Sequence, residues 1–158
     1  MSELRNLTVN PKPFNLNSWQ KFGACEITVT DQIMRVVNTS GGGGMGASYP
    51  ITALPAGEYV YRFDAVELTG YQNNEQFAML KVGSAYQSVL RYAAGMDSLC
   101  TDEFTLYTAA NIELLIVPPG TAGGVIRARR FMISSKNDYA AMLKDGVTWF
   151  DGDGAVKN

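Results

Sequence analysis

The first residues of this sequence that could carry chemistry form a glycine-rich run after a short β-favouring segment. Gly41, Gly43 and Gly46 have the spacing that wraps the phosphates of a dinucleotide. That use requires a helix to begin at the run, because the N-terminus of the helix binds the pyrophosphate. Pro50 and Pro55 exclude a long helix there. We therefore interpret the run as a connection between strands and expect no cofactor.

Acidic side chains are the remaining candidates for catalysis, because the sequence contains no histidine. Without histidine, Ser-His and Cys-His nucleophile pairs and most zinc sites are excluded. Two carboxylates could cleave a glycosidic bond, but Asp102 and Glu103 are neighbours and point to opposite faces of a strand. Asp151 and Asp153 are typical of a calcium loop, but the chain ends before the Glu that such a loop requires. We expect no catalytic residue, no metal ligand and no enzymatic activity, with a glycosidase as the alternative.

Aromatic rings in polar segments indicate a binding function instead. Tyr71 is followed closely by Asn73 and Asn74, in a segment where contact of the ring with an apolar core would be hard to arrange. A ring can cover the C–H face of a sugar while neighbouring amides bond its hydroxyl groups. Tyr86, which has a glutamine beside it, is a second candidate. We predict that these four residues contact a ligand; the alternative is that the rings are ordinary half-buried loop tyrosines.

Short β-favouring segments separated by turn signals must position these side chains. In the clearest segment, residues 58–68, Tyr61 and Phe63 lie on one face and Arg62 and Asp64 on the other. The other predicted strands are 25–30, 33–37, 77–82, 88–92, 103–108, 111–117 and 125–134. No helix long enough for a parallel crossover separates them. The pattern predicts an all-β fold, an antiparallel two-sheet sandwich of the jelly-roll type, with Phe63, Ile112, Leu114 and Phe131 in its core.

One short helix is expected near the C-terminus. Asn137 or Asp138 can cap its start, and Gly146 follows its end. Tyr139, Met142 and Leu143 share one face, and a helix of this length must dock to be stable. We expect residues 1–158 to form a single domain, with 137–158 as a helix and tail that pack on the sandwich.

Composition limits the partners of this domain. The 158 residues carry a net charge of −2, with 18% charged and 46% hydrophobic residues, so no electrostatic signature of nucleic-acid binding is present. Arg127, Arg129 and Arg130 lie on a predicted strand, where ion pairing on a sheet face explains them. No apolar run is long enough for a membrane span or signal peptide, which predicts synthesis in the cytoplasm and no membrane contact.

Cys25 and Cys100 are either buried thiols or a disulfide.

Two separated segments resemble a known family. Asn10, Pro11 and Phe14 followed by Trp19, and the closing segment 138–153 with Tyr139, Trp149, Phe150 and Asp151-Gly152-Asp153, carry the resemblance. They are similar to carbohydrate-binding-module-like jelly rolls of minor tail and fibre proteins. Those proteins belong to siphophages and prophages of Gram-positive, especially actinobacterial, hosts.

The resemblance implies roles for particular residues. Trp19 and Trp149 would be structural anchors, and the tail segment would fold back on the sandwich. Many relatives have a Glu after the Phe that helps to hold a structural calcium, but here that residue is Asn15, which argues against calcium. The family also contains domains with no shown sugar ligand, so the resemblance implies a fold first.

Three hypotheses for function follow from these observations. The first is a phage tail-associated module that binds glycan on the host cell wall. The second is a virion structural or decoration protein whose partner is another virion protein, and the third is a bacterial carbohydrate-binding module. The first two place the protein in the virion tail, made in the host cytoplasm without a signal peptide; homo-oligomerisation stays open.

Overall fold

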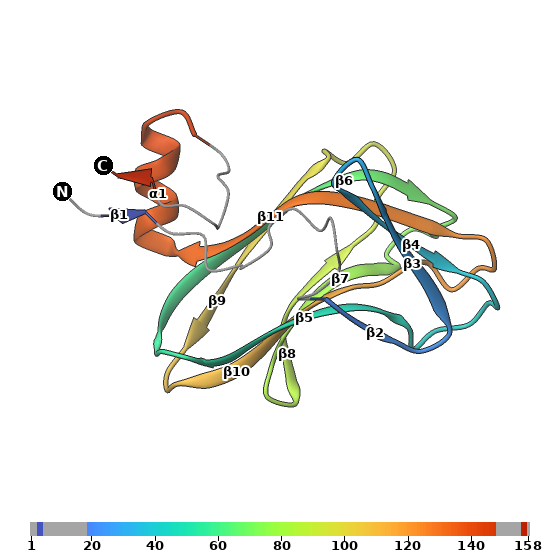
Figure 1. Ribbon diagram of the computed structural model, residues 1–158, viewed down its shortest axis with the longest axis horizontal. Helices are drawn as coiled ribbons and strands as arrows, with labels where there is room; N and C mark the ends of the chain where they lie inside the picture. The colour runs from blue at the N-terminus through green and yellow to red at the C-terminus, as the bar shows by residue number, and fades with distance from the viewer. Residues whose placement is uncertain (1–2, 5–18, 148–155, 158) are drawn as a thin grey trace.

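The computed structural model describes residues 3–4, 19–147 and 156–157, and its ribbon is drawn in Figure 1. Its strands are β1 Glu3–Leu4, β2 Gln20–Phe22, β3 Cys25–Thr30, β4 Ile33–Asn38, β5 Gly46–Leu54, β6 Gly57–Thr69, β7 Gln76–Val82, β8 Ala85–Arg91, β9 Leu99–Leu106, β10 Ala110–Ile116, β11 Val125–Ser135 and β12 Val156–Lys157. Helix α1 covers Lys136–Lys144.

Two antiparallel sheets face each other across a common core (Figure 1). We call the sheet with strand order β2-β5-β10-β7-β8 the cleft sheet, and the sheet with order β3-β4-β11-β6-β9 the helix-side sheet. The two short strands β1 and β12 form a separate antiparallel pair next to α1. Every predicted strand is present with its ends shifted by at most a few residues. The predicted all-β two-sheet sandwich is therefore confirmed.

The sequence does not predict β5, because Pro50 lies in its middle and a proline cannot donate a hydrogen bond to a strand ladder. In the structure β5 pairs with β10, and β2 covers only its first residues, Gly46 to Ser48. Within the part of the chain that the structure describes, Pro50 thus lies on a stretch of β5 that pairs on one side only, where the missing N–H costs little. The glycine run between β4 and β5 leads into this strand, which confirms that it connects strands.

The core between the sheets is built on aromatic rings. The four side chains predicted to fill it are at most 1% exposed: Phe63, Ile112, Leu114 and Phe131. Ring centroids are 4.7 Å apart for Trp19 and Phe131, and 5.5 Å apart for Phe131 and Phe63. Phe77 of the cleft sheet continues the series, 6.4 Å from Phe63. This series confirms Trp19 as a packing residue; Trp149, the other expected anchor, lies outside the described residues.

A bulge in β11 decides which of its side chains reach the core. Ile126 and Ala128 face the core, so regular alternation would turn Phe131 to the outer face. At Arg130 the backbone takes a left-handed φ of 57°, and the pairing with β6 shifts there. A bulge changes the phase of a strand, so Phe131 and Ile133 also face the core.

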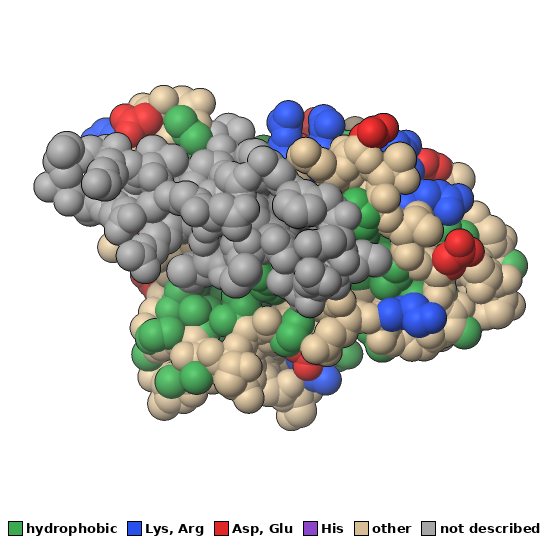
Figure 2. Space-filling model, viewed as in Figure 1, with side chains coloured by type: hydrophobic (Ala, Val, Ile, Leu, Met, Phe, Trp, Pro, Cys, Tyr) green, Lys and Arg blue, Asp and Glu red, His purple; other side chains and the backbone are tan. Residues whose placement is uncertain are grey.

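The outer face of the helix-side sheet carries ion pairs. Nη1 of Arg127 lies 3.4 Å from Oε1 of Glu67, and Nη1 of Arg130 lies 3.7 Å from Oδ2 of Asp64. Asp64 also accepts a hydrogen bond of 2.8 Å from Nη2 of the buried Arg62. Figure 2 shows side chains of both charges mixed over the upper right of the molecule. The ion pairing predicted for this arginine cluster is confirmed for Arg127 and Arg130.

Helix α1 begins earlier than predicted. Its N-cap is Ser135, whose Oγ accepts a hydrogen bond of 3.1 Å from the N–H of Asp138. The predicted caps Asn137 and Asp138 are therefore wrong; the serine that ends β11 takes this role because its hydroxyl reaches the third residue of the helix. Gly146 follows the helix with a left-handed φ of 75°, as expected. In the described residues no helix is long and apolar enough to cross a membrane.

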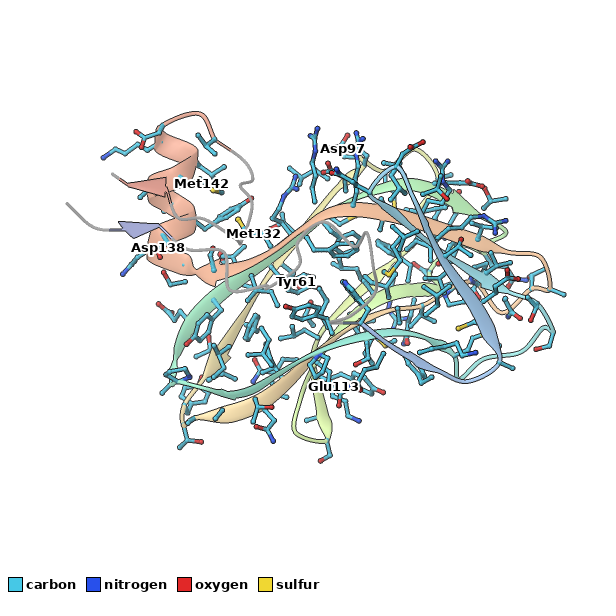
Figure 3. All side chains as sticks on the ribbon, in the orientation of Figure 1. Tyr61, Asp97, Glu113, Met132, Asp138 and Met142 are labelled. Atoms are coloured by element: carbon cyan, nitrogen blue, oxygen red, sulfur yellow. The ribbon has the colours of Figure 1, made fainter. Side chains whose placement is uncertain are left out.

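The helix docks through methionine. Met142 is 1% exposed and packs with Met132 of β11 (Figure 3). Tyr139 packs against this pair. Leu143, predicted to dock, is 45% exposed. That prediction is wrong because only a narrow stripe of this short helix faces the sheet. The docking predicted for residues 148–155 lies outside the described residues.

Cys25 and Cys100 are both buried free thiols. Burial raises the pKa of the Cys100 thiol to about 11, so it stays protonated and unreactive at neutral pH. Of the two alternatives that the sequence leaves open, the structure has the small buried apolar residue.

The side chain of Gln87 joins the two sheets along one border. Its Nε2 donates to the carbonyl of Thr105 at 2.8 Å, and its Oε1 accepts from the N–H of Thr105 at 3.1 Å. Gln87 belongs to β8 of the cleft sheet and Thr105 to β9 of the helix-side sheet. One amide group therefore hydrogen-bonds to β9 as a neighbouring strand would.

Candidate functional site: a cleft on the outer face of the cleft sheet

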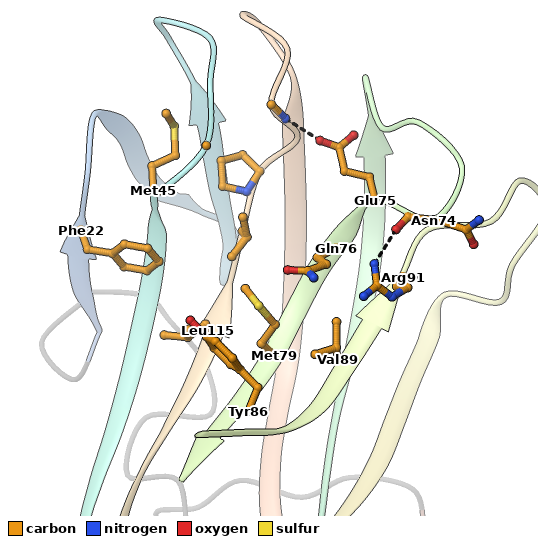
Figure 4. A pocket seen from close by; sticks show the side chains of 15 residues that line it. Phe22, Met45, Asn74, Glu75, Gln76, Met79, Tyr86, Val89, Arg91 and Leu115 are labelled. Atoms are coloured by element: carbon orange, nitrogen blue, oxygen red, sulfur yellow. Dashed lines mark hydrogen bonds between the residues drawn. The ribbon is translucent and has the colours of Figure 1, made fainter. Parts of the chain in front are cut away.

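An open cleft of about 530 Å³ crosses the outer face of the cleft sheet. Figure 4 shows side chains from β2, β7, β8 and β10 that converge on it, together with the loops at one end of the sheet. Its lining residues include Phe22, Met45, Asn74, Glu75, Gln76, Met79, Tyr86, Val89, Arg91, Leu115 and Gly120. The volume falls within the range of about 300–1,000 Å³ that small-molecule sites occupy.

The floor of the cleft is apolar because its strands carry apolar residues on both faces. Leu114 of β10 faces the core, so its neighbour Leu115 faces outward. Met79 of β7 lies opposite Leu115, and Val89 of β8 lies opposite Met79. Leu115 and Met79 are nevertheless only 6% and 8% exposed. The three side chains form a continuous apolar strip across the sheet.

Two aromatic rings flank this strip. Phe22 projects from β2 on one side and is half-buried. Tyr86 of β8 is 55% exposed, and Nζ of Lys81 lies 6.0 Å from the centroid of its ring. A ring held at this exposure offers a flat apolar surface to a ligand without belonging to the core.

Polar side chains lie at the end of the cleft formed by the β6–β7 loop. Nη1 of Arg91 donates to the carbonyl of Asn74 at 3.0 Å (Figure 4). Glu75 accepts two backbone hydrogen bonds, from the N–H of Gln72 at 2.9 Å and from the N–H of Gly120 at 2.7 Å. The amide of the half-buried Gln76 has no side-chain hydrogen bond within the described part of the chain and is available to a ligand.

The loops at this end are tied together by Asn38, which is fully buried. Its Nδ2 donates to the carbonyls of Gly42 and Pro119 at 2.8 and 2.9 Å. Its Oδ1 accepts from the N–H groups of Gly41 and Ser40 at 2.7 and 3.1 Å. Because the adjacent residues of both loops line the cleft, this single side chain holds one end of the site in shape. Sequence reasoning missed this role; a polar residue at the end of an apolar strand just before a glycine run is the signal that could have found it.

The structure divides the predicted ligand contacts into two groups. Tyr86 and Asn74 line the cleft, whereas Tyr71 and Asn73 are not among its lining residues. Sequence reasoning missed Phe22, Met79, Leu115 and Arg91. A usable signal was present, because the segments 77–82 and 111–117 are apolar on both faces while a sandwich needs only one apolar face.

The expectation that Tyr71 avoids the core is wrong. Its ring stacks on Tyr92 at 5.7 Å and meets the edge of Phe77 at 6.2 Å, and its hydroxyl donates to the carbonyl of Val117. Desolvation is the main cause that raises the pKa of this phenol. The sequence misleads here because the neighbours of Tyr71 in the chain are polar, whereas its contacts come from other parts of the fold. Through these contacts Tyr71 anchors its loop to the core.

Replacing Tyr71 with phenylalanine should lower the free energy of unfolding by about 1 kcal/mol, because the ring contacts stay and one hydrogen bond to a half-buried carbonyl is lost. Urea denaturation of the variant and the wild type measures this difference. Tyr86→Phe is the matched control and should leave stability unchanged, because the hydroxyl of Tyr86 is not required by the core. Equal effects of the two substitutions would contradict the anchoring role of Tyr71.

The carboxylates considered for catalysis do not share a site. Asp102 accepts a hydrogen bond from Ser88 Oγ, whereas Glu103 forms an ion pair of 3.2 Å with Lys136 on the outer face. They point to opposite faces, as predicted from their adjacent positions. Among the described residues no three His, Cys, Asp or Glu side chains gather as a metal site. Asn15, which bears on calcium, and Asp151 and Asp153 lie outside those residues.

Solved structures similar to this chain include carbohydrate-binding modules and a part of a phage tailspike. The second N-terminal cellulose-binding domain of β-1,4-glucanase C from Cellulomonas fimi has a TM-score of 0.59 and 16% identity; the match covers 85% of this chain and 96% of that domain. The module TmCBM61, solved with β-1,4-galactotriose, has a TM-score of 0.55 and 17% identity over 84% of this chain and 99% of that module. The enzymatically active domain of tailspike protein 4 from bacteriophage CBA120 has a TM-score of 0.56 and 12% identity over 82% of this chain and 21% of that domain's chain.

At these identities the likeness concerns the fold alone. No family model matches the sequence, and no curated protein matches it either. The solved structures nevertheless show that the chain has the jelly-roll fold found in carbohydrate-binding modules, as the resemblance of the two segments implied.

Proposed function

We propose that this chain is a non-catalytic glycan-binding module and that the cleft on the outer face of the cleft sheet holds the sugar chain. The observation that carries the proposal is the combination of an apolar strip, an exposed tyrosine and unpaired polar groups in one cleft. Sugars need this combination, because their C–H faces are apolar and their hydroxyl groups require hydrogen bonds. The fold that the chain shares with carbohydrate-binding modules supports the same conclusion.

The arrangement of the cleft favours an extended oligosaccharide over a single sugar. The apolar strip crosses three strands, from Leu115 through Met79 to Val89. Consecutive sugar rings can lie along it, with Tyr86 covering one ring. Gln76 and Arg91 then face hydroxyl groups at the loop end.

Replacing Tyr86 with alanine should weaken glycan binding about tenfold, which corresponds to roughly 1.4 kcal/mol, because a stacked ring contributes an amount of this size. Affinity electrophoresis through gels that contain soluble β-1,4-glucan, xylan or galactan measures the change. Stability should stay nearly constant, because the ring is exposed.

Tyr107→Ala is the matched control for this experiment. Tyr107 is 87% exposed in the turn after β9 and does not line the cleft, so its removal should leave binding unchanged. Equal binding by Tyr86→Ala and the wild type would contradict the placement of the sugar. Failure of the wild type to bind any glycan of a broad panel would contradict the function.

We also propose that the module acts in a phage tail, where the glycan belongs to the host cell wall. The resemblance of the two terminal segments to tail and fibre proteins supports this setting, as does the occurrence of the same fold within a phage tailspike. The tailspike also favours a second candidate, a virion structural or decoration protein. Pull-down with intact host cell walls separates them: the first requires binding that Tyr86→Ala weakens, and the second requires co-assembly with tail proteins without glycan binding.

A further inference from the structure

We propose that the cleft selects glycans that carry an anionic group, a carboxylate or a phosphate, and that Arg91 binds this group. The inference rests on the proposed glycan-binding function and names the class of glycan. Its starting point is a cation in the cleft that forms no ion pair within the described part of the chain.

Arg91 is an exposed arginine at the end of β8 that lines the cleft. It forms no ion pair with any described residue. A second hollow of about 210 Å³ adjoins it, and Asp97, which lines that hollow, does not pair with it either. The guanidinium has five N–H donors, and only the bond to the Asn74 carbonyl occupies one of them.

That bond holds the guanidinium in place. Asn74 has a left-handed φ of 69°, and its own N–H donates to the carbonyl of Tyr92 at 2.8 Å. The N–H of Tyr92 in turn donates to the carbonyl of Glu75 at 2.8 Å. The loop that carries the Asn74 carbonyl is thus fixed to the end of β8, and Arg91 is oriented before a ligand arrives. A pre-oriented guanidinium fork matches a carboxylate or phosphate in two-point contact.

Glu75, the carboxylate that lines the cleft, forms no ion pair with Arg91. Both oxygens of Glu75 accept backbone N–H groups, at 2.9 Å from Gln72 and 2.7 Å from Gly120. Glu113, also on the outer face of this sheet, accepts a hydrogen bond of 2.9 Å from Ser48. Lys81 lies over the ring of Tyr86 and adds a second cation beside the cleft. The carboxylate oxygens near the apolar strip are thus engaged by the protein itself, whereas four N–H donors of Arg91 have no partner among the described residues.

Anion binding at this place would be local. The whole chain has a net charge of −2, so its overall field does not attract polyanions. Binding of an acidic glycan therefore has to depend on Arg91 and on contact with the apolar strip, in contrast to binding by a generally basic surface.

The experiment compares acidic polymers with neutral ones on the intact chain. Affinity is measured by isothermal titration with polygalacturonate, with the same polymer after reduction of its carboxyl groups, and with poly(glycerol phosphate). The wild type should bind at least one acidic polymer about tenfold more tightly than the carboxyl-reduced polymer, the size expected for a charge-assisted contact. A preference for polygalacturonate assigns a carboxylate, and a preference for poly(glycerol phosphate) assigns a phosphate.

Two substitutions with the same change in charge test the residue. Arg91→Gln should lower the affinity for the acidic polymer about tenfold more than the affinity for the reduced polymer, which abolishes the preference. Arg91→Lys should retain part of the preference, because the positive charge stays. Arg35→Gln removes an exposed arginine from β4, on the other sheet, and should change nothing. Melting temperatures of all three variants should match that of the wild type, because both arginines are exposed.

The possible failures have different meanings. Equal binding of acidic and reduced polymers, or an equal loss in Arg91→Gln and Arg35→Gln, overturns the anionic selectivity and leaves glycan binding standing. Absence of binding to every neutral and acidic glycan overturns the proposed function, and the selectivity with it.

Discussion

Replacing Phe131 with alanine should lower the free energy of unfolding by about 3–5 kcal/mol, as large-to-small substitutions of buried aromatic residues do. The side chain is 0% exposed and contacts the rings of both Trp19 and Phe63. Phe63 belongs to β6 and Trp19 directly precedes β2, so the two rings are held by separate elements and can fill the space only in part. For a chain of this length the melting temperature should fall by roughly 10 °C.

Differential scanning calorimetry or urea denaturation measures this effect. Phe131→Leu keeps most of the volume and should cost about half as much or less. Tyr107→Ala removes a ring that is 87% exposed and should change stability by less than about 0.5 kcal/mol. A loss below 1 kcal/mol in Phe131→Ala would show that the bulge does not turn this ring into the core.

Replacing Asn38 with alanine should lower the free energy of unfolding by about 2–3 kcal/mol, because four backbone groups lose their partner and one or more of them stay out of reach of water. The two loops that Asn38 joins also form the end of the cleft. We therefore expect glycan affinity to fall as well, at temperatures where the variant is fully folded. Thermal denaturation and affinity electrophoresis on the same sample measure the two effects.

Asn111→Ala is the comparison for this prediction. Asn111 is exposed and accepts one hydrogen bond, of 2.9 Å from the N–H of Ala53, so its loss should cost less than 1 kcal/mol. A similar cost for both substitutions would mean that the loops hold their shape without Asn38. Unchanged glycan binding by a destabilised Asn38→Ala would separate the stability of the loops from the site.

The sequence predicts well what depends on local alternation. Segment 58–68 places Tyr61 and Phe63 on the core face, and the structure has them there. The sequence also predicts that Phe131 is buried. Simple alternation along 125–134 would nevertheless place this ring on the outer face, because nothing in the sequence marks the bulge at Arg130. The sequence does not predict β5 for a related reason. A strand tolerates a proline such as Pro50 where one edge is unpaired, and the sequence does not show which edge that is.

The candidate site could be predicted only in part. Tyr86 and Asn74 line the cleft because they lie on or beside the strands that form it. Tyr71 was given the wrong environment because its partners, Tyr92 and Val117, are brought to it by other strands. A cleft on the outer face of a sheet is produced by side chains from four strands, and the order of those strands in the sheet is not written in any single segment.

The amide of Gln87 also bears on how the protein behaves at high concentration. The border strand of a sheet presents unpaired N–H and C=O groups, on which a strand of another molecule can add and begin aggregation. At Thr105 both groups of β9 are already bonded to Gln87. At this point of the edge, an intermolecular strand therefore finds no free backbone group to pair with, and the side chain of Gln87 opposes strand addition without changing the fold of β9.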